Sequence, residues 1–453
     1  MPTTECKQVY FAFHSLPPVV VVADAPRISS DGGVVLVRQA EQKTGVCCGI
    51  TGCLRDLRDA DRVLHPREEQ TQQRVFQIAM GYEDCNDANS LRHDAAFKTA
   101  CGRLPDDANG LSSQPVLSRF ENDVDGRVLN AVRDFLERAY VESLPADTTL
   151  VVLDIDTTDD PTHGHQQLTF FHGFYDQHMY HPLLVFDGQS GQAITALLRP
   201  GNAHASKSAA IVLRGVIRKV KARFPNAQIL VRGDSGFSVP RVLEALEELN
   251  RELGDVDYVI GIAKNPRLLG LGQAALDVAA QQHADTNHHV RHFTSFSYAA
   301  ESWSHPRHVV MKAEHSDKGA NPRFVVTTLA GIDPQLVYDR AYCARGQCEN
   351  NIKDLKNALN ADRLSCSSFK ANALRLLLHV AAYRLVFAIR QAAGAVSPEL
   401  ATAQFDTLRL RLLKVAAQVK QSARRILIRL PAVFPFAQAF AEIAYALGAP
   451  QPA

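Results

Sequence analysis

Two short runs of apolar, largely β-branched residues each end in an acidic side chain. Residues 149–156 read Thr-Leu-Val-Val-Leu-Asp-Ile-Asp, and residues 228–236 read Gln-Ile-Leu-Val-Arg-Gly-Asp-Ser-Gly. Apolar runs of this length, closed by polar residues or glycine, are typical of buried strands. The pattern therefore predicts two buried strands, each of which delivers an aspartate at its carboxyl end.

The segments around these two runs complete a pattern of alternating strands and helices. Further strands are predicted at 167–175, 182–187, 193–199 and 257–263, and helices at 206–223 and 239–253. An antiparallel meander that continues into right-handed strand–helix–strand crossovers gives a mixed sheet with helices on both faces. We therefore predict an α/β fold with a ribonuclease-H-like mixed sheet, which carries one aspartate on its first strand and one on its fourth.

The flanking segments predict a chain of several parts. Residues 33–37 are expected to be extended, and two apolar periodicities favour helices at 70–82 and 128–144. The predicted order is an irregular lead-in (1–40), a helical region (41–145), the first part of the core (146–264), a β-rich insertion (265–335), the second part of the core (336–392) and a C-terminal helical region (393–453).

A third acidic residue lies on a predicted helix, within a stripe of chemically unusual composition. Tyr342, Arg345, Glu349 and Lys356 are separated by three, four and seven residues. Because a helix turns about 100° per residue, the last three fall at about 300°, 340° and 320° from the first. Such a stripe places one carboxylate between an aromatic ring and two cations. A carboxylate in this setting can bind a metal ion, and the cations beside it can hold phosphates.

Two strand-end aspartates and one helical glutamate are the components of a two-metal phosphoryl-transfer site. Mg²⁺ prefers a few carboxylates together with water and substrate phosphates. Two such ions activate the attacking oxygen and stabilise the leaving oxygen. Each acid taken alone also fits a plain structural role, as a turn cap or as one partner of a surface ion pair.

The composition is that of an ordinary globular protein, with a formal net charge of +1. Charge is uneven, however, since residues 401–430 contain seven Lys or Arg and one acid, Asp406. This excess predicts a phosphate-contacting surface or, alternatively, a solvated helix face. The cations in that segment are Arg409, Arg411, Lys414, Lys420, Arg424, Arg425 and Arg429.

Cysteine and histidine usage argues against structural zinc and against a disulfide framework. There are nine cysteines, an odd number, and no Cys-x-x-Cys pair. Five histidines lie between 163 and 181, with no further motif of zinc-ligand spacing. We expect a cytoplasmic protein, because no secretory signal or membrane-spanning segment is apparent.

Together, these motifs resemble the DD-E transposases of bacterial insertion sequences, with the family conventionally numbered thirteen-eighty as the suggested match. The resemblance covers the chain from about residue 75 to the C-terminus. Beyond the Tyr-Arg-Glu-Lys stripe, it rests on the sequences at 80–84, 91–94, 114–122, 153–164, 198–202 and 232–237.

The resemblance implies a magnesium-dependent recombinase that binds terminal inverted repeats, cuts the DNA ends and joins them to a target. In such families the first acid lies in an Asp-x-Thr pattern, so Asp156 is preferred and Asp154 is its rival. We expect these two side chains to diverge, so that only one faces the metals. Asp234 and Glu349 are the other two predicted metal ligands and catalytic acids.

Further roles follow from the same resemblance. Arg345 and Lys356 would grip phosphates, with Tyr342 beside them, and two Mg²⁺ ions, or Mn²⁺ in their place, would be the cofactors. The helical region at 41–145 would read the terminal repeats, and the C-terminal helices would add DNA contacts or oligomerisation. Double-stranded DNA is the implied partner, and a homodimer would form on it.

Trp303 is the only tryptophan and lies in the predicted insertion. Related transposases stack a flipped base on an aromatic residue there, although an ordinary core position is the simpler expectation. Two alternative functions remain open: a ribonuclease-H-like nuclease without strand transfer, and a DNA-binding protein derived from a transposase.

Overall fold

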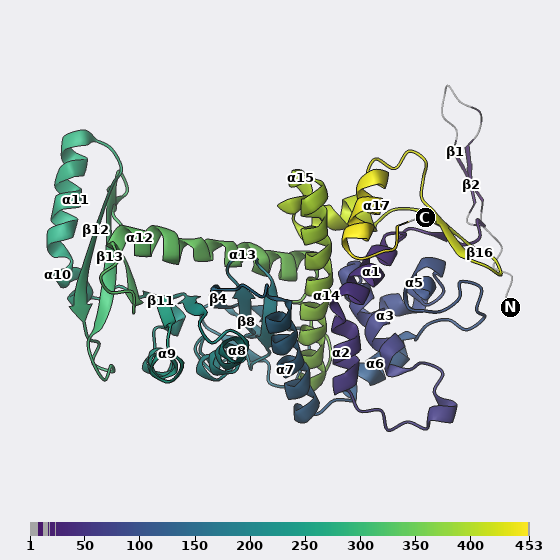
Figure 1. Cartoon of the computed structure of the whole chain (residues 1–453), viewed down its shortest axis with the longest axis horizontal. Coiled ribbons are helices and arrows are strands. Elements are labelled where there is room, and N and C mark those ends of the chain that lie inside the picture. Colours follow the sequence, from purple (N-terminus) through teal and green to yellow (C-terminus); the bar gives the residue numbers. More distant parts are fainter. Residues whose placement is uncertain (1–7, 12–16, 18, 23, 452–453) are drawn as a thin grey trace. The chain divides into compact units, whose positions relative to one another are not determined.

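The computed structural model describes residues 8–11, 17, 19–22 and 24–451, and the chain divides into two compact units. Their elements are labelled in Figure 1. These units cut across the predicted domain boundaries, because the predicted helical region at 41–145 contributes to both. The first unit contains Met1–Thr44, Asp59–Leu117 and Ala388–Ala453, and the second contains Gly45–Arg58 and Ser118–Phe387.

The second unit is built on a mixed sheet whose strands run in the order β12-β13-β15-β11-β10-β4-β8-β9. Parallel pairing joins β4 to β10 and β10 to β11, and antiparallel pairing joins β4 to β8 and β8 to β9. The predicted meander and crossovers are therefore present. The strands are β4 (Leu150–Thr157), β8 (Leu183–Asp187), β9 (Ala193–Leu197), β10 (Gln228–Gly233), β11 (Val256–Ile262), β12 (Val290–Tyr298), β13 (Arg307–Ser316) and β15 (Arg323–Thr327).

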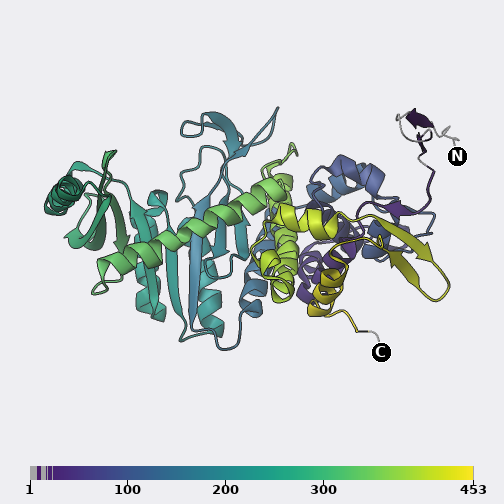
Figure 2. The same cartoon turned by 90° about the horizontal axis from the view of Figure 1, so that it is seen from above.

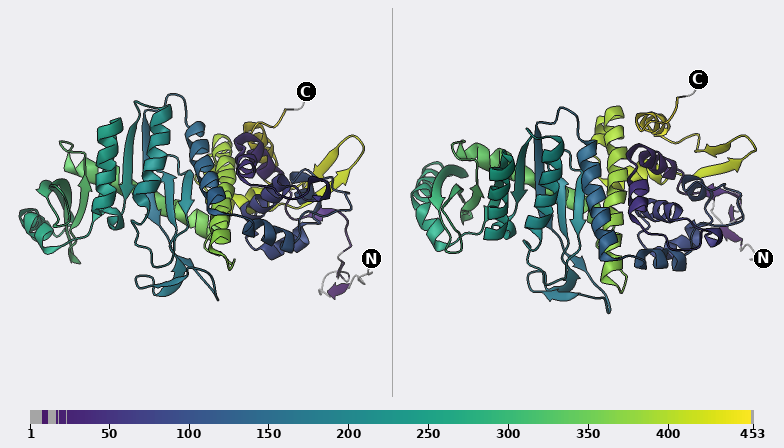
Figure 3. Two further views of the ribbon diagram at one scale, coloured as in Figure 1. Left: turned by 90° about the horizontal axis from the view of Figure 1, so that it is seen from below. Right: turned by 60° about the horizontal axis from the view of Figure 1, so that its bottom comes forward.

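Apolar and acidic side chains of β4 lie on opposite faces of this sheet. Val151, Leu153 and Ile155 of β4 face the main hydrophobic core, together with the inner sides of α8 (Ala209–Arg223) and α9 (Pro240–Leu253). Successive strand residues point to opposite faces, so the intervening Asp154 and Asp156 face the other way. A long helical segment that includes α13 (Gly346–Lys353) crosses that second face (Figures 2 and 3).

The predicted β-rich insertion also contains helices, and its strands extend the main sheet. Two helices, α10 (Pro266–Leu271) and α11 (Gln273–Thr286), precede its strands. The strand β15 then pairs with β11, and β13 with β15, so that the insertion continues the sheet at that edge. Buried Ala275 and Ala279 let α11 pack closely against the outer strands.

A three-stranded flap projects from the second unit between β4 and β8. It consists of β5 (Asp160–Pro161), β7 (Gln177–Tyr180) and β6 (Phe170–His172), paired in that order. The single long strand predicted at 167–175 is therefore wrong, because only three of its residues are extended within a tight meander.

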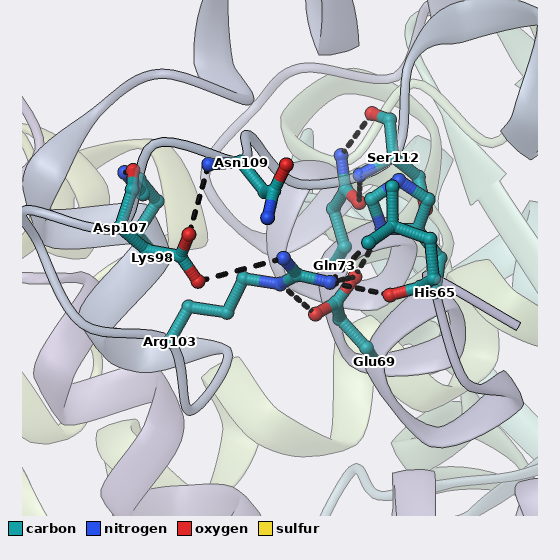
Figure 4. Close-up of polar contacts among 9 residues, drawn as sticks. His65, Glu69, Gln73, Lys98, Arg103, Asp107, Asn109 and Ser112 are labelled. Carbon is teal, nitrogen blue, oxygen red and sulfur yellow. Dashed lines mark hydrogen bonds and ion pairs between the residues drawn. The ribbon is translucent and has the colours of Figure 1, made fainter.

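The first unit contains a helical layer with many polar side chains inside it. On α3 (Arg67–Ala79), Gln73 exchanges two hydrogen bonds of 2.9 Å with the backbone of Ser112. Glu69 lies 2.7 Å from Nδ1 of His65 and forms an ion pair with Arg103 (Figure 4). The contacts with Ser112 fix the loop that contains this residue against the helix, because buried polar groups require partners. Further elements of this unit are β1 (Val9–Phe11), β2 (Val19–Val21), β3 (Ile28–Ser29), α4 (Ala88–Leu91), α5 (Ala95–Ala100), α15 (Pro398–Ala401), α16 (Phe405–Leu408) and α17 (Ala437–Ala446).

Two secondary-structure predictions in the first unit are wrong. The segment expected to be extended at 33–37 begins α1 (Val34–Thr44), because its Val-Val-Leu-Val run buries one side of a helix. The predicted C-terminal helical region contains a hairpin of β16 (Ala417–Gln421) and β17 (Ile426–Arg429). Its apolar residues also satisfy strand alternation, and β16 gains a third strand by pairing with β3.

The longest helix, α14 (Phe369–Val396), is apolar enough to cross a bilayer by length and composition, yet 94% of its most apolar window is buried inside the protein. In the second unit its Arg384 donates to three carbonyl oxygens: Ala193 at 2.9 Å, Ile194 at 2.7 Å and Leu136 at 2.7 Å. This side chain joins the helix to the sheet edge and to α7 (Gly126–Ser143).

We predict that Arg384→Met lowers the free energy of unfolding by about 3 kcal/mol, because three buried carbonyls lose their donor. Urea denaturation provides the measurement. Arg218→Met is the matched control, since the ion pair of Arg218 with Glu252 is exposed and such pairs contribute at most about 1 kcal/mol. Equal losses in the two variants would contradict the role assigned to Arg384.

Candidate active site

The parallel register of β4 and β10 brings two of the predicted acids to one edge of the sheet. Asp154 pairs with Arg232 across the strands, and Ile155 pairs with Gly233. Asp156 and Asp234 each follow the last of these paired residues. Because parallel strands end at the same edge, these two carboxylates leave the sheet side by side.

Asp154 is buried and fully engaged. Its side chain is 1% exposed and accepts from Nε of Arg232 at 2.6 Å and from Nη2 at 2.8 Å. The expectation that Asp154 and Asp156 diverge is wrong, because residues two apart on a strand share a face. What separates them is depth: Asp154 neutralises a buried guanidinium, whereas Asp156 lies at the sheet edge.

Asp156 lies where several charges meet. Nη1 of Arg345 donates to its Oδ2 at 2.8 Å, and the backbone N–H of Thr157 donates to its Oδ1 at 2.8 Å. Burial raises the pKa of Asp156 to about 6, and the charges of Asp234 and Glu349 add to this rise while Arg345 opposes it. The three predicted acids therefore share one electrostatic environment.

Asp234 is held in place by the turn that it begins. Its Oδ1 accepts from the N–H of Gly236 at 2.9 Å, which caps the short turn Ser235–Phe237. The carboxylate is only partly buried and keeps its second oxygen outside this cap. Its position is thus fixed by the backbone rather than by a salt bridge.

The helical segment that carries the Tyr-Arg-Glu-Lys stripe is less regular than predicted. It passes from a π-helix (Val337–Tyr342) through a 3₁₀ turn (Cys343–Arg345) into α13, and then into a second π-helix (Asp354–Ala358). These transitions shift the angular positions expected for a uniform α-helix. Glu349 is exposed in the middle of the segment.

Two cations of the stripe still face the end of β4. Arg345 reaches Asp156, and Lys356 donates to Asp159 at 2.6 Å and lies 3.7 Å from Asp362. Both cations are thus paired with acids. Asp159 and Asp362 were not predicted as site residues, although Asp159 directly follows the Asp-x-Thr motif at 156–158.

Tyr342 packs at the start of the stripe. Its ring lies 6.0 Å from the guanidinium carbon of Arg345 and 5.6 Å from the ring of Tyr338. Burial raises the pKa of the Tyr342 phenol, and the charge of Asp234 adds to this effect. The phenol is therefore a neutral hydrogen-bonding group beside the acids.

The chemistry of the acidic donor set fits hard divalent cations. Three carboxylates, from β4, the end of β10 and α13, are the kind of oxygen ligand that such cations prefer. Within the described part of the chain, no three His, Cys, Asp or Glu side chains enclose a metal position, and this includes the histidines of the flap. Arg345 occupies an oxygen of Asp156 that a cation would need.

Trp303 has a core environment. Its side chain is 8% exposed and belongs to the main hydrophobic core. The indole lies 5.4 Å from the ring of Tyr298, and the Arg307 guanidinium stacks over it at 5.0 Å. In this conformation the ring cannot stack on a DNA base.

Comparison with known proteins identifies a family, and solved structures with a similar fold include one transposase. The family model described as transposase DDE domain group 1 matches residues 11–451. The fold is similar to a piggyBac transposase in a synaptic complex with hairpin DNA, with 9% identity, a TM-score of 0.45 and coverage of 85% of this chain and 80% of that one. No curated protein matches the chain.

The two rival acids are predicted to respond differently to neutralisation in the absence of divalent metal. Asp154→Asn leaves Arg232 buried without its counter-charge and is expected to cost about 3 kcal/mol or more of unfolding free energy. Asp156 has a folded pKa near 6 against an ordinary value of 3.8, so its contribution to stability is present below pH 4 and is lost as pH rises through 6. Asp156→Asn is therefore expected to gain stability relative to wild type between pH 4 and pH 7.

Urea denaturation at several pH values in EDTA measures both effects. A decrease in stability in Asp156→Asn as large as that in Asp154→Asn would contradict the assignment of Asp154 to the core and Asp156 to the site.

Proposed function

The chain belongs to the transposase DDE domain group 1 family, and from this premise we propose that it cuts the ends of a mobile element and joins them to target DNA by metal-dependent phosphoryl transfer. The observation that supports the proposal is the parallel register of β4 and β10, which ends these two strands in Asp156 and Asp234 at one edge of the sheet. Terminal inverted repeats of an insertion sequence of the thirteen-eighty type would be the substrate.

We assign the core of the second unit to the ribonuclease-H-like type. Its strand order β9-β8-β4-β10-β11 supports this, since an antiparallel meander ends at the central strand and two parallel strands follow. The proposed acids then lie at the carboxyl ends of the first and fourth strands of that core. Helices α8 and α9 support the opposite face from that of the acids.

Asp156, Asp234 and Glu349 would hold two Mg²⁺ ions, with Mn²⁺ as a substitute. When bound, these ions offset the charge of the phosphodiester and prepare the attacking hydroxyl for in-line displacement. The same acids would serve hydrolysis and strand transfer alike, because only the attacking hydroxyl differs.

Arg345 and Lys356 would contact the DNA phosphates near the scissile bond. Arg345 is paired with Asp156, and Lys356 with Asp159. A guanidinium can form two hydrogen bonds with a phosphate, as it does with a carboxylate. A DNA phosphate can therefore replace the carboxylate partner of Arg345 without leaving the arginine unpaired. Tyr342 would support Arg345 through its ring.

A second DNA-contacting element is the basic hairpin β16–β17 of the first unit. Lys420, Arg424, Arg425 and Arg429 are exposed on it, and none of them has an ion-pair partner among the residues described. Gln418 of β16 pairs with Arg429 of β17, so their side chains lie on the same face of the hairpin. Lys420 lies two residues after Gln418 on the same strand and therefore also lies on that face. Arg424 and Arg425 lie in the turn between the two strands. A two-stranded ribbon with unpaired cations fits the phosphates that line a DNA groove.

Two active copies would be required to pair two element ends, so we propose a homodimer on DNA. The cleavage-only nuclease and the non-enzymatic DNA-binding protein differ from the transposase in their products. Joined products require an enzyme that carries out strand transfer, nicks alone indicate the nuclease, and unchanged DNA indicates the binding protein.

Asp234→Asn and Glu349→Gln are each predicted to lower Mg²⁺-dependent cleavage and joining by at least about 100-fold. Binding to end DNA should remain, because neither substitution removes a cation. The measurement is gel analysis of labelled end DNA incubated with target plasmid, with and without Mg²⁺. Asp277→Asn on the exposed side of α11 is the matched control. Unchanged cleavage by Glu349→Gln would remove the catalytic proposal.

Replacing the three hairpin arginines at 424, 425 and 429 by alanine is predicted to weaken DNA binding at every sequence alike. The slope of log affinity against log salt should fall by about 1 for each DNA phosphate that the variant no longer binds. Arg241→Ala with Lys318→Ala, two exposed cations of the second unit, is the control. The alternative outcome is a variant whose salt slope for DNA binding is unchanged but which self-associates. This result would mean that the arginines prevent another chain from pairing with the unpaired edge of β17.

A further inference from the structure

The outermost strand of the main sheet, β12, has one open edge. It pairs with β13 along all nine of its residues, and no other strand in the described part of the chain pairs with its far side. The opposite edge of the sheet is covered, because Arg384 of α14 donates to the carbonyl oxygens of Ala193 and Ile194 in β9. A further strand can therefore join the sheet at β12.

The strand β12 lacks the features that usually prevent pairing at an exposed edge. Natural edge strands are commonly very short, bulged, interrupted by proline or charged. β12 contains no proline, and its register with β13 is continuous from Val290 to Tyr298. Its only lysine or arginine, Arg291, is paired with Asp339 at 3.0 Å. Nothing in its sequence therefore opposes the addition of another strand.

Helices cover both faces of the sheet beside this edge. On one face α11 packs against β12 and β13, with Ala275 and Ala279 in the main hydrophobic core (Figure 1). On the other face α12 (Pro334–Leu336) packs against β12 and leads to Tyr338, whose ring lies 5.9 Å from that of Phe293. The strand is thus supported on its two faces and open along its edge.

These two helical layers expose large apolar side chains. Leu271 ends α10, Val278 lies on α11, Ile332 precedes α12 and Leu336 ends it. Each of the four is between 41% and 53% exposed. A chain that extends the sheet at β12 would lie beside both layers, so that it would meet apolar surface as well as open backbone groups.

The sequence of β12 is compatible with antiparallel pairing to a second copy of itself. Successive side chains alternate between the two faces, so a two-fold axis through Thr294 keeps each residue on its own face. In that register Val290 would lie opposite Tyr298, a favourable β-branched and aromatic pair, and Arg291 opposite Ser297. No two like charges would therefore meet along the strand.

The position of α11 also fits this arrangement. The helix packs against β12 and β13 to nearly equal extents, so its axis lies over the space between the two strands. Adjacent strands are about 4.8 Å apart, and two copies of α11 would therefore be separated by two strand spacings, about 10 Å. Packed helices lie about 8–10 Å apart, so the two copies could contact one another across the seam.

We propose that two copies of this chain pair through β12, about a two-fold axis at Thr294, and form one continuous sheet. This contact goes beyond the proposed function, since it requires neither DNA nor metal. It is isologous, so both copies use the same surface and the assembly stops at two. An extended segment of a different protein is the alternative occupant of such an edge.

The residue on the axis provides the first test, because residue 294 of each copy lies opposite itself. Thr294→Lys and Thr294→Glu are each expected to weaken dimerisation about tenfold or more, since like charges would meet at the seam. An equimolar mixture of the two variants is expected to dimerise again, because the charges are then opposite. Analytical ultracentrifugation of the full chain without DNA, at concentrations up to about 100 μM, measures the mass.

Thr149→Lys and Thr149→Glu are the matched controls, since Thr149 is exposed before β4 and is expected to leave the mass unchanged. Wild-type protein that is monomeric over the whole concentration range would overturn the proposal. A dimer that persists in both Thr294 variants would also overturn it and would place the contact on another surface. A mixture that stays monomeric, although each variant keeps the wild-type circular dichroism spectrum, would refute self-pairing and leave the edge to a different protein.

A cysteine on the axis provides a second test. Residues directly opposite one another in an antiparallel pair have Cα atoms about 4.5–5.5 Å apart, a separation that a disulfide can span. Mild oxidation of Thr294→Cys is expected to link two chains through residue 294, as identified by peptide mass spectrometry. Thr149→Cys should form no link through residue 149. A dimeric Thr294→Cys protein without the 294–294 link would contradict the proposed pairing.

DNA cleavage separates this contact from the proposed function. A chain that dimerises through β12 but cleaves no end DNA in Mg²⁺ would refute the proposed function and leave the contact standing. Wild-type protein that is monomeric without DNA but cuts and joins DNA ends would refute the contact and leave the proposed function standing.

Discussion

The parallel pairing of β4 with β10 is the constraint on which the site depends. One register places Asp154 opposite Arg232, and it is the same register that ends both strands in an acid at one edge. A slip of one residue would turn the Arg232 side chain to the apolar face and separate it from its carboxylate. The buried ion pair therefore specifies the register, while the apolar residues on the other face supply most of the stabilisation.

The same geometry explains why a buried acid and a reactive acid can lie two residues apart. Both point to one face, and the pairing of Arg232 with the deeper acid removes it from competition for metal. The outer acid keeps a raised pKa, because burial and two neighbouring carboxylates disfavour its charge. A raised pKa also means that a proton competes with any cation at this carboxylate until the pH exceeds about 6.

Sequence patterns predicted the elements whose chemistry is local. The strand-end aspartates, the meander and the helices α8 and α9 follow from apolar runs and turn residues. The sequence-based predictions were wrong where a segment fits both helix and strand periodicity and tertiary contacts decide between the two. The Val-Val-Leu-Val run of α1 suits a strand equally well, and the 417–429 hairpin depends on pairing with β3, a segment nearly 400 residues away that no local pattern links to it. Ion pairs such as Lys356 with Asp159 also lie beyond local patterns, because they need the fold to bring the partners together.

For the Tyr-Arg-Glu-Lys stripe, the sequence predicted a uniform α-helix, which is wrong, although two of its residues do lie on one side of the segment. The interruption by π and 3₁₀ turns changes the angular spacing, yet Arg345 and Lys356 both reach the end of β4. Irregular turns widen a helix locally and re-aim the side chains that follow. Here they let one segment serve two neighbours, since the Tyr342 hydroxyl lies beside Gly261 of β11 while Arg345 contacts Asp156. Tyr342, Arg345 and Glu349 are therefore positioned by one continuous element, and any movement of that element shifts all three together.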